Sequence, residues 1–461
     1  MKLIVTIQEE TFEAALQAIG ELNQPHDQSH DQPHDGIELR AEHLAAVDLG
    51  ALRAATPGML ILTHRGRRVD ESIVRAAIAA GVDLVDVEWH EALDRDLVHR
   101  YADRIILSHH DYDGMPDVER ILESMRSFGA VQTKLAVTPQ SFEDNRRLLE
   151  ALHGQSGGVT MIGMGARGLY SRILTPFFGS ELQFVAVSED RGAAPGQLTL
   201  AQARAIYGAA RQLQVPRHIF AIVGNPAAHS LSPSIHNALF RERGVAAAYS
   251  IFETDALDDI LRPFAAGTSG APTGLSVTSP FKEAAFAFAQ ECGAVIAPNA
   301  REAGAVNTLV RVTQTEMVAD NTDVDGFAAI LAQVCGRDRK SVALLGAGGT
   351  ARAALVALRR QGMHVTLFNR TLGKARALHP NTAPLDDLAR FDGEIVINTM
   401  TAGVDLEIAL KLGMTYIEAG YGQPANENER PGIQHFNGRD LLQAQAVRQN
   451  QLFMRMFDES R

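Results

Sequence analysis

The chain has 461 residues but only two cysteines, Cys292 and Cys335, and it carries no basic tail. The two cysteines form no metal-binding or redox motif, so we expect a reducing compartment, the cytoplasm, and no metal site. The formal net charge of −12 argues against a nucleic-acid partner. The start, MKLIVTIQEE, turns acidic after one short apolar run, so the sequence predicts neither a signal peptide nor a membrane span.

Short apolar runs recur along roughly the first two hundred residues, separated by helix-like segments rich in Ala, Leu and Arg. Eight strands alternating with helices predict an α/β fold of the (β/α)8 TIM barrel type, with an open doubly wound sheet as the alternative. The runs are LIVTI at residue 3, GIELR at 36, MLILTHR at 59, LVDVEW at 84, RIILSHH at 104, TKLAV at 133, GVTMIGMG at 158 and QFVAVS at 183.

Polar residues share one face of these predicted strands. Side chains alternate along a strand, so every second residue of a barrel strand points into the interior. A purely structural barrel interior would be filled by Val, Ile and Leu, and a polar lining therefore predicts an active site. The residues on this face are Glu38, Arg40, Thr63, Arg65, Asp86, Glu88, Ser108, His110 and Lys134.

Lys134 stands among apolar neighbours in the run VQTKLAV. The ordinary interpretation is a lysine whose stem is buried and whose head reaches water. In a dry cavity, however, the pKa of a lysine falls, and the neutral amine can attack a ketone to form a Schiff base. His110 is then the candidate proton acceptor, and Glu88 can orient its ring. A substrate carboxylate and hydroxyls would suit the forked donors of three arginines, Arg40, Arg65 and Arg172.

The ordered motifs GIELR, DVEW, ILSHHD, TKLAVTPQ, YSRI and APGQ resemble those of type I 3-dehydroquinate dehydratases over residues 1–214. The resemblance implies that Lys134 forms the imine with 3-dehydroquinate and that His110 transfers protons, so that water leaves to give 3-dehydroshikimate. It also places Arg172 on the substrate carboxylate, with Gln197 on a closing loop. That loop usually reads Ser-Ala-Pro-Gly-Gln, and Ala193 replaces the serine, so substrate affinity or lid closure is expected to be weaker. Glu38 is a further substrate-binding candidate.

One repetitive stretch, PHDQSHDQPHD at residues 25–35, could in principle bind a metal. It precedes the second predicted strand and therefore belongs to the N-terminal face of the barrel, away from the catalytic end. We expect a solvated insertion there.

The sequence predicts a domain boundary near Val215. The segment TLAQARAIYGAARQL, residues 199–213, is predicted as the eighth barrel helix, and IFAIVGNP starts a new strand-and-loop pattern. We expect a barrel over 1–214, an α/β substrate domain over 218–325 plus 440–461, and a Rossmann nucleotide-binding domain over 326–439.

The run VALLGAGGTA forms a G-x-G-x-x-A turn after a predicted strand and before a predicted helix. Glycines in this position let a pyrophosphate approach the start of the helix. At the end of the next strand, NRT stands where an NAD-binding unit usually has an acidic residue, which favours NADP; a plain surface arginine is the alternative. The predicted cofactor-binding residues are Gly346, Ala347, Gly348, Gly349, Asn369, Arg370 and Thr371.

Three polar clusters precede that turn: GNPAAHSLSPSIHN, SVTSPFKE and GAVNTLV with ADNTDVDG. Reduction of a ketone requires a proton for the developing alkoxide, and Lys282 with Asp323 form a plausible donor and partner. Four short polar residues could hold a hydroxylated ring, although each alone is more typical of a turn or helix cap. They are Ser230, Ser232, Thr278 and Asn307.

Together these clusters resemble shikimate dehydrogenases from about residue 218 to the C-terminus. The resemblance implies that Lys282 and Asp323 are the catalytic pair and that Gln445 reaches the substrate from a C-terminal helix that folds back. SVTSPFK has serine where many bacterial members have asparagine, and it matches the form seen in plant fusion enzymes. The segment EAGYGQPANENERPGIQHFNG departs from the usual Tyr-x-Pro turn, and Tyr421 is the matching residue there.

The two resemblances support each other, because the first half would produce what the second half consumes. The sequence thus predicts a cytosolic bifunctional enzyme that converts 3-dehydroquinate to shikimate with NADPH and acts on small molecules, as a monomer or a homodimer. An NADP-dependent quinate or shikimate dehydrogenase with an impaired barrel is one alternative, which the complete set of Lys134, His110 and Glu88 disfavours. A metabolite-sensing regulator without catalysis is the other. It would need neither catalytic lysine, and the sequence contains no DNA-reading element.

Overall fold

The computed structural model describes residues 1–24, 34–42, 44–64, 71–155, 157–209, 213–335, 340–400, 410–420 and 432–458. These residues divide into two compact units. The first unit comprises Met1–Ile219, Asn237–Thr254 and Ser269–Ala271, and the second comprises Phe220–His236, Asp255–Thr268 and Pro272–Arg461. Two predicted substrate-binding residues, Arg65 and Tyr421, lie outside the described residues, as do residues 25–33 of the His-Asp repeat.

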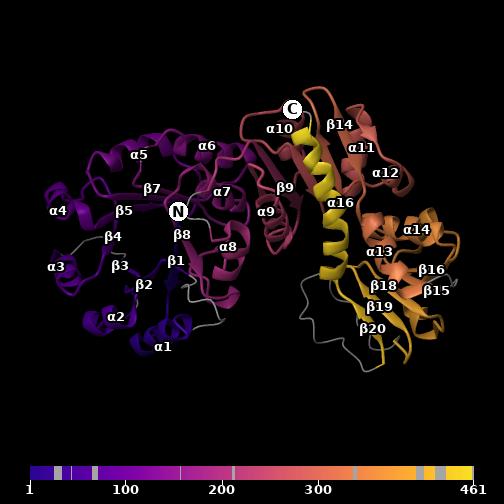
Figure 1. The fold of residues 1–461 in the computed structure, drawn as a ribbon, viewed down its shortest axis with the longest axis horizontal. Helices are drawn as coiled ribbons and strands as arrows, with labels where there is room; N and C mark the ends of the chain where they lie inside the picture. The colour runs from indigo at the N-terminus through magenta and orange to yellow at the C-terminus, as the bar shows by residue number, and fades with distance from the viewer. Residues whose placement is uncertain are drawn as a thin grey trace. The chain divides into compact units, whose positions relative to one another are not determined.

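The first unit contains the predicted parallel barrel (Figure 1). The strand order is β7-β6-β5-β4-β3-β2-β1-β8, so β1 to β7 pair with their sequence neighbours and β8 pairs with β1. This order rules out the doubly wound alternative with its reversed strand order. Just before β8, the main-chain N–H of Glu181 donates to the carbonyl of Val159 in β7 at 3.0 Å and brings the two ends together. The strands are β1 Lys2–Ile7, β2 Gly36–Arg40, β3 Met59–His64, β4 Leu84–Glu88, β5 Ile105–His110, β6 Gln132–Val137, β7 Val159–Gly163 and β8 Leu182–Ala186.

Helices surround these strands, and apolar side chains fill the space between the two layers (Figure 1). The last of them, α8, ends at Tyr207, so the prediction of a helix through residue 213 is wrong. Gly208 follows with φ +69°, a positive value that glycine adopts readily, and the helix ends there. The helices are α1 Phe12–Leu22, α2 Leu49–Ala55, α3 Glu71–Ala79, α4 Arg95–Arg100, α5 Val118–Arg126, α6 Phe142–Leu152, α7 Leu169–Leu174 and α8 Leu200–Tyr207, with short 3-10 helices at Ala102–Arg104, Thr175–Phe178 and Glu189–Arg191.

The strand β10 (Ala247–Glu253) belongs to the first unit because it packs against α7. The hydroxyl of Ser250 donates to the main-chain carbonyl of Tyr170 at 3.0 Å. The rings of Phe142, Tyr170 and Phe252 meet edge to face, with centroids 5.7 to 6.0 Å apart. The helix that carries Arg172 is thus held by a strand that comes after the barrel in the sequence.

A second sheet has the strand order β10-β9-β11-β13-β14-β12 and mixes parallel with antiparallel pairs. Its strands are β9 His218–Gly224, β11 Gly274–Val277, β12 Val295–Ile296, β13 Thr308–Arg311 and β14 Met317–Asp320, besides β10. The accompanying helices are α9 Ser232–Glu242, α10 Asp258–Ala266, α11 Lys282–Glu291, α12 Pro298–Ala303 and α13 Asp323–Cys335.

The third sheet is parallel throughout, with the order β17-β16-β15-β18-β19-β20, which is the 3-2-1-4-5-6 order of a Rossmann fold. The final helix, α16, runs back along α13 (Figure 1). The strands are β15 Ser341–Leu345, β16 His364–Asn369, β17 Thr382–Pro384, β18 Ile395–Asn398, β19 Thr415–Glu418 and β20 Gln434–Phe436. The helices are α14 Gly349–Arg360, α15 Leu372–Leu378 and α16 Gly438–Asp458, with a 3-10 helix at Leu385–Arg390.

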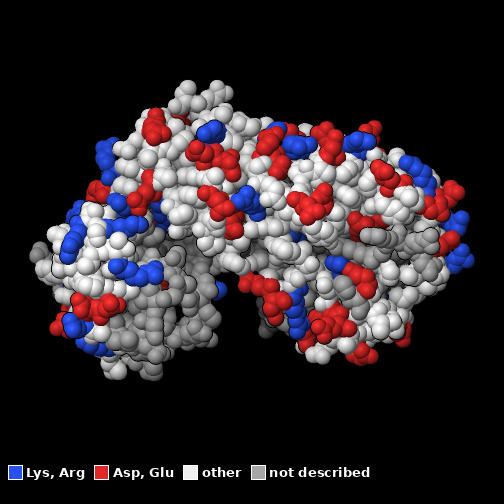
Figure 2. All heavy atoms as spheres, turned by 180° about the vertical axis from the view of Figure 1, so that it is seen from behind, with Lys and Arg blue, Asp and Glu red and all other residues white. Residues whose placement is uncertain are grey.

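Basic and acidic side chains are interspersed over the face drawn in Figure 2. Among the helices of the described residues, we find none with the length and apolar character needed to cross a bilayer.

Candidate active sites

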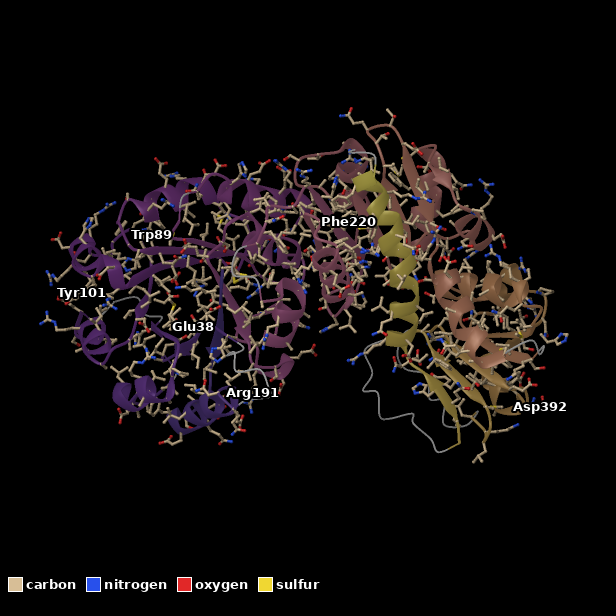
Figure 3. All side chains as sticks on the ribbon, viewed as in Figure 1. Glu38, Trp89, Tyr101, Arg191, Phe220 and Asp392 are labelled. Atoms are coloured by element: carbon tan, nitrogen blue, oxygen red, sulfur yellow. The ribbon has the colours of Figure 1, made fainter. Side chains whose placement is uncertain are left out.

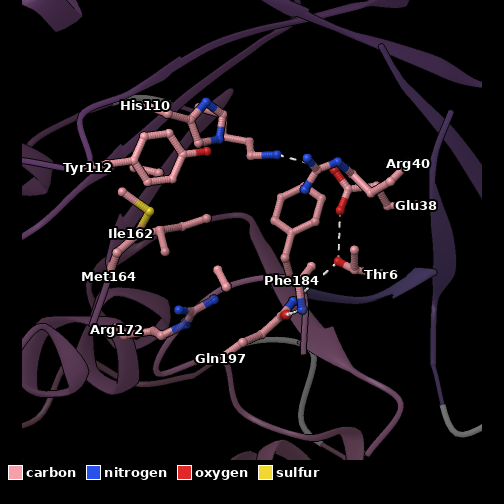
Figure 4. Close-up of a pocket in the computed structure, with 14 residues that line it drawn as sticks. Thr6, Glu38, Arg40, His110, Tyr112, Ile162, Met164, Arg172, Phe184 and Gln197 are labelled. Carbon is pink, nitrogen blue, oxygen red and sulfur yellow. Dashed lines mark hydrogen bonds and ion pairs between the residues drawn. The ribbon is translucent and has the colours of Figure 1, made fainter. Parts of the chain in front are cut away.

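A cavity opens at the C-terminal ends of the barrel strands and encloses about 440 Å³ of space including its mouth (Figure 4). This is the end where barrel enzymes carry their catalytic groups. Six predicted site residues line it, from several different strands, helices and loops: Glu38, Arg40, His110, Lys134, Arg172 and Gln197. Its other lining residues are Thr6, Tyr112, Ala136, Ile162, Met164, Phe184, Ala193 and Ala194.

The side chain of Lys134 points into this cavity and is only 4% exposed. Its Nζ lies 2.7 Å from Oδ2 of Asp86 and 3.4 Å from Oε1 of Glu38. The same nitrogen lies 4.0 Å from the ring centroid of Phe184. Two carboxylates thus lie beside the nitrogen of Lys134, and the neutral state expected for this amine stays a prediction. The sequence predicts Asp86 on the interior face, but no role for it at Lys134.

Glu38 lies inside the ring of strands, whereas Tyr101 lies at the outer edge of the barrel (Figure 3). Burial alone would raise the pKa of Glu38. The charge of Lys134 and the hydrogen bonds from Thr63 and Thr6, both 2.7 Å long, outweigh burial and lower the pKa to about 2. Glu38 is therefore a carboxylate throughout the physiological pH range.

His110 ends β5 and is held by Glu88, which ends the neighbouring strand β4. Nδ1 of His110 lies 2.7 Å from Oε2 of Glu88, so Nε2 is the ring nitrogen outside this pair. Tyr112 stacks on the imidazole with a centroid distance of 6.1 Å and an interplanar angle of 17° (Figure 4). The hydrogen bond with Glu88 and the stacking of Tyr112 both orient the ring. Sequence reasoning missed Tyr112, which lies beyond the strand end where alternation no longer indicates direction.

Arg172 on α7 is buried in the wall of the cavity. Its Nε and Nη1 have no hydrogen-bond partner among the described residues. Burial lowers the pKa of Arg172 to about 10, although the charge interaction with Tyr207 acts in the opposite direction, so the group is still charged at neutral pH. A buried guanidinium with unused donors is the type of group that binds a carboxylate or phosphate.

Arg40 and Gln197, two further predicted substrate-binding residues of the barrel, form hydrogen bonds within the protein. Nε of Arg40 donates to Oε1 of Glu42 at 2.6 Å, a pair that the sequence does not predict. Oε1 of Gln197 accepts from the main-chain N–H of Ala193 at 2.8 Å, and Nε2 of Gln197 donates to the hydroxyl of Thr6 at 3.3 Å (Figure 4). The loop is therefore hydrogen-bonded to itself and to β1, although Ala193 offers no hydroxyl.

In the second unit, Lys282 and Asp323 form a buried pair. Lys282 starts α11 and Asp323 starts α13. Nζ of Lys282 donates to Oδ2 of Asp323 at 2.6 Å, and to the hydroxyl of Thr350 at 2.9 Å. The predicted donor and partner are thus adjacent, and Thr350 is a neighbour that sequence reasoning missed.

Two further predicted residues join this pair through a hydrogen-bond network. Nδ2 of Asn307 donates to Oδ1 of Asp323 at 2.9 Å. The hydroxyl of Thr322 donates to Oε1 of Gln445 on α16 at 2.7 Å and is itself bonded to Asn307. The C-terminal helix therefore folds back onto the site, as expected.

The other substrate-binding candidates of the second unit lie in loops and helix starts. Ser232 begins α9, and its main-chain N–H donates to the hydroxyl of Ser230 at 3.2 Å. Thr278 lies in the turn before α11, and its carbonyl accepts from the main-chain N–H of Phe281 at 3.0 Å. Contact of Ser230, Ser232 and Thr278 with a substrate stays a prediction.

The glycine turn between β15 and α14 has room for a pyrophosphate. Gly346 has φ +105°, and a Cβ there would lie 2.6 Å from Oγ1 of Thr399. At Gly348 an added Cβ would meet nothing within 4 Å, so the backbone is open on this side. The helix α14 begins directly after, at Gly349, with its first N–H groups unpaired within the helix. These features fit a dinucleotide phosphate, with Ala347 in the same turn.

The NRT segment lies beside this turn because the main-chain N–H of Gly346 donates to the carbonyl of Phe368 at 3.0 Å. Nδ2 of Asn369 donates to the carbonyl of Thr371 at 2.9 Å and shapes the loop. The side chain of Arg370 is exposed. An exposed arginine in this place can reach a 2′-phosphate.

Family models match both halves of the chain. The model described as type I 3-dehydroquinase matches residues 17–214, and the shikimate dehydrogenase substrate binding domain matches residues 222–309. The bifunctional 3-dehydroquinate dehydratase/shikimate dehydrogenase, chloroplastic, of Arabidopsis thaliana is 27% identical over 424 residues, which cover 83% of this chain and 69% of the relative. The shikimate dehydrogenase (NADP(+)) of Hyphomonas neptunium is 36% identical over 249 residues, which cover 50% of this chain and 89% of the relative.

Two solved structures illustrate the similarity, one to the whole chain and one to its second half. The dehydroquinate dehydratase and shikimate dehydrogenase part of the S. pombe pentafunctional protein covers 99% of this chain and 98% of its own, with 22% identity and a TM-score of 0.39. The shikimate 5-dehydrogenase of Thermus thermophilus, solved with NADP(H) and shikimate, covers 51% and 93%, with 26% identity and a TM-score of 0.43.

The fold defines a two-part α/β protein, with an eight-stranded parallel barrel followed by a mixed sheet and a Rossmann-type parallel sheet. The chain belongs to the shikimate dehydrogenase family and is a fusion of a type I dehydroquinase domain with a shikimate dehydrogenase domain.

Proposed function

We propose that the barrel dehydrates 3-dehydroquinate to 3-dehydroshikimate and that the second unit reduces this product to shikimate with NADPH. The proposal rests on Arg172, whose buried guanidinium lines the same cavity as Lys134 and His110. Two of its nitrogens, Nε and Nη1, have no hydrogen-bond acceptor among the described residues. A substrate that combines a carboxylate with a ketone would satisfy both the arginine and the lysine. 3-Dehydroquinate has both groups.

The dehydration requires the neutral amine of Lys134, which forms when the ammonium gives its proton to solvent. The free amine adds to the ketone, and loss of water from the carbinolamine gives a protonated imine. His110 then removes a proton from the adjacent carbon, and the electron pair moves into an enamine. The hydroxyl on the next carbon leaves as water with the proton that His110 returns. Hydrolysis of the imine releases the product and restores Lys134.

Each supporting group has a defined task in this scheme. Glu88 stabilises the imidazolium that forms when His110 takes the proton. Arg172 binds the carboxylate, and Arg40, Glu38 and Gln197 hold hydroxyls of the ring. Arg65 belongs to the same proposal on the strength of the sequence alone.

In the reductase site, NADPH supplies the hydride when it is bound. Lys282 donates a proton to the oxygen of the ketone as that oxygen becomes an alkoxide, and Asp323 holds the ammonium in place. Asn307 and Gln445 lie in the same network, and we assign them to substrate hydroxyls. Ser230, Ser232, Thr278 and Tyr421 complete the proposed substrate contacts.

We assign the cofactor to the turn Gly346–Gly349 and to Asn369, Arg370 and Thr371. The NADP(+) specificity in the name of the H. neptunium relative supports this choice. The same proposal includes the domain boundaries, namely a barrel over 1–214, a substrate domain over 218–325 with 440–461 and a nucleotide-binding domain over 326–439. It also includes a cytoplasmic location.

The test follows NADPH absorbance after addition of 3-dehydroquinate alone, because a signal requires both halves to work. We expect oxidation by the natural chain and none by Lys134→Ala, which should still reduce added 3-dehydroshikimate. Lys411→Ala, at an exposed lysine, serves as the matched control. A natural chain that reduces 3-dehydroshikimate but ignores 3-dehydroquinate would identify an impaired barrel. A chain that binds both and converts neither would identify a sensor.

A further inference from the structure

The first turns of three helices of the second unit lie close together. α11 starts at Lys282, α13 at Asp323 and α14 at Gly349. Nζ of Lys282 lies 2.6 Å from Oδ2 of Asp323 and 2.9 Å from Oγ1 of Thr350, the second residue of α14. The proposed proton donor is therefore bonded directly to the helix that opens the nucleotide-binding domain.

The starts of α11 and α14 are in close contact. A Cβ at Gly349 would lie 2.7 Å from Cβ and 3.0 Å from Cδ of Lys282, so only glycine permits this approach. Further along the two helices, Nη2 of Arg352 lies 3.4 Å from Oε2 of Glu283. Gly349, the third glycine of the turn, thus leaves space for the aliphatic part of the Lys282 side chain as well as for a phosphate.

The carboxylate of Asp323 attracts the ammonium of Lys282, but the dipoles of the neighbouring helices do not. The N-terminus of a helix carries partial positive charge, so the starts of α11 and α14 do not attract the side chain of Lys282. Asp323 accepts one of the three donors of the ammonium, and Thr350 accepts another. Two acceptors on two helices fix the direction of the lysine, which one acceptor alone would leave free to rotate.

We propose that Thr350 is a positioning residue for Lys282, and that its hydroxyl holds Nζ at the place from which the ketone receives its proton. The role rests on the proposed reductase function. It differs from phosphate binding, which the same helix start could provide. The first turn of α14 would then serve the proton donor and the cofactor together.

The first test measures steady-state oxidation of shikimate by the full chain with Thr350→Val, Thr350→Ser and Thr313→Val. Thr350→Val keeps the shape and loses the hydroxyl, so we expect kcat to fall about tenfold, the typical effect of losing a hydrogen bond to a charged group. Thr350→Ser should restore kcat to within about twofold, because the hydroxyl remains. Thr313 lies in an exposed turn, and Thr313→Val should leave kcat unchanged. The affinity for NADP+, measured by calorimetry, should change little in all three variants.

The second test does not depend on activity. An amine-reactive acylating reagent and peptide mass spectrometry give the modification rate of Lys282, with the exposed Lys374 as internal reference. We expect Thr350→Val to raise the rate at Lys282 severalfold and to leave Lys374 unchanged. An unchanged rate at Lys282 overturns the proposal, even in a chain that proves inactive toward shikimate. A Thr350→Val variant with normal kcat and a large loss of NADP+ affinity also overturns it, in favour of phosphate binding.

Discussion

A single carboxylate, that of Glu88, holds His110 at two points. Oε2 lies 2.7 Å from Nδ1 of the ring, and Oε1 accepts the main-chain N–H of His110 at 2.9 Å. The carboxylate therefore fixes both the end of β5 and the direction of the imidazole. It also places a negative charge next to the ring that must become positive during proton transfer.

Replacing Glu88 by Gln keeps a hydrogen-bonding group of the same size but removes this charge. We expect kcat of the dehydratase to fall about 10²-fold, because the imidazolium loses its counter-ion. Formation of product from 3-dehydroquinate, followed by its ultraviolet absorbance, measures the effect. Reduction of added 3-dehydroshikimate should be unaffected. Glu123→Gln, at an exposed position on α5, is the control, and an equal loss in that variant would contradict the assignment.

Replacing Arg172 by Met should make the fold more stable and at the same time weaken the binding of 3-dehydroquinate. The pKa of Arg172 is lowered to about 10 by burial, so its charged form costs free energy at every pH below that value. Removing an uncompensated buried charge should raise the free energy of unfolding by about 1–4 kcal/mol at pH 7. The same change should raise KM for 3-dehydroquinate at least about 10²-fold, because the carboxylate loses its bidentate partner. Urea unfolding followed by the fluorescence of Trp89, the one tryptophan of the chain, reports on the barrel.

The control for that variant is Arg120→Met, at an exposed arginine on α5. It should leave both stability and KM close to those of the natural chain. A destabilised Arg172→Met variant would show that the guanidinium has partners that offset its burial.

Glu38 should contribute to stability in a defined pH window. Its pKa is lowered from 4.5 to about 2 in the folded chain, so the folded state holds the carboxylate charged where the unfolded chain binds a proton. The contribution is complete above about pH 4.5 and is lost as the pH falls through about 2. The unfolding free energy of the natural chain minus that of Glu38→Gln should therefore decrease by about 2–4 kcal/mol over this range. A difference that stays constant with pH would contradict the lowered pKa.

Arg370→Ala tests the choice of cofactor. Arg370 is exposed and lies one residue beyond β16, beside the glycine turn. Loss of a contact to the 2′-phosphate should raise KM for NADPH by about 10-fold or more and leave KM for NADH unchanged. Arg376→Ala, at an exposed arginine on α15, should change neither value. Equal changes in KM for NADPH and for NADH would show that Arg370 does not contact the 2′-phosphate.

The barrel can be predicted from the sequence because each of its strands has a recognisable pattern within a few consecutive residues. Each strand shows an apolar run, and alternation assigns its polar residues to one face, so the sequence alone places Glu38, His110 and Lys134 together. The predicted eighth helix is too long, because a glycine within a helical pattern can be tolerated or can end the helix. At Gly208 the backbone takes φ +69° and ends it.

The partners of the site residues are not predictable in the same way. Asp86 and Lys134 are 48 residues apart, and Lys282 and Thr350 are 68 residues apart. Such pairs depend on how strands and helices pack, which no spacing in the sequence encodes. The contact of Arg40 with Glu42 is close in sequence, but it forms just beyond the end of β2, where the alternation of a strand no longer applies.

The central claim is that the amine of Lys134 condenses with the substrate ketone. The most direct measurement adds borohydride during turnover of 3-dehydroquinate and locates the reduced adduct by peptide mass spectrometry. The account predicts one stable adduct, on Lys134, which is absent without substrate and absent in Lys134→Ala. Turnover of 3-dehydroquinate with no adduct, or with an adduct on another lysine, would contradict it.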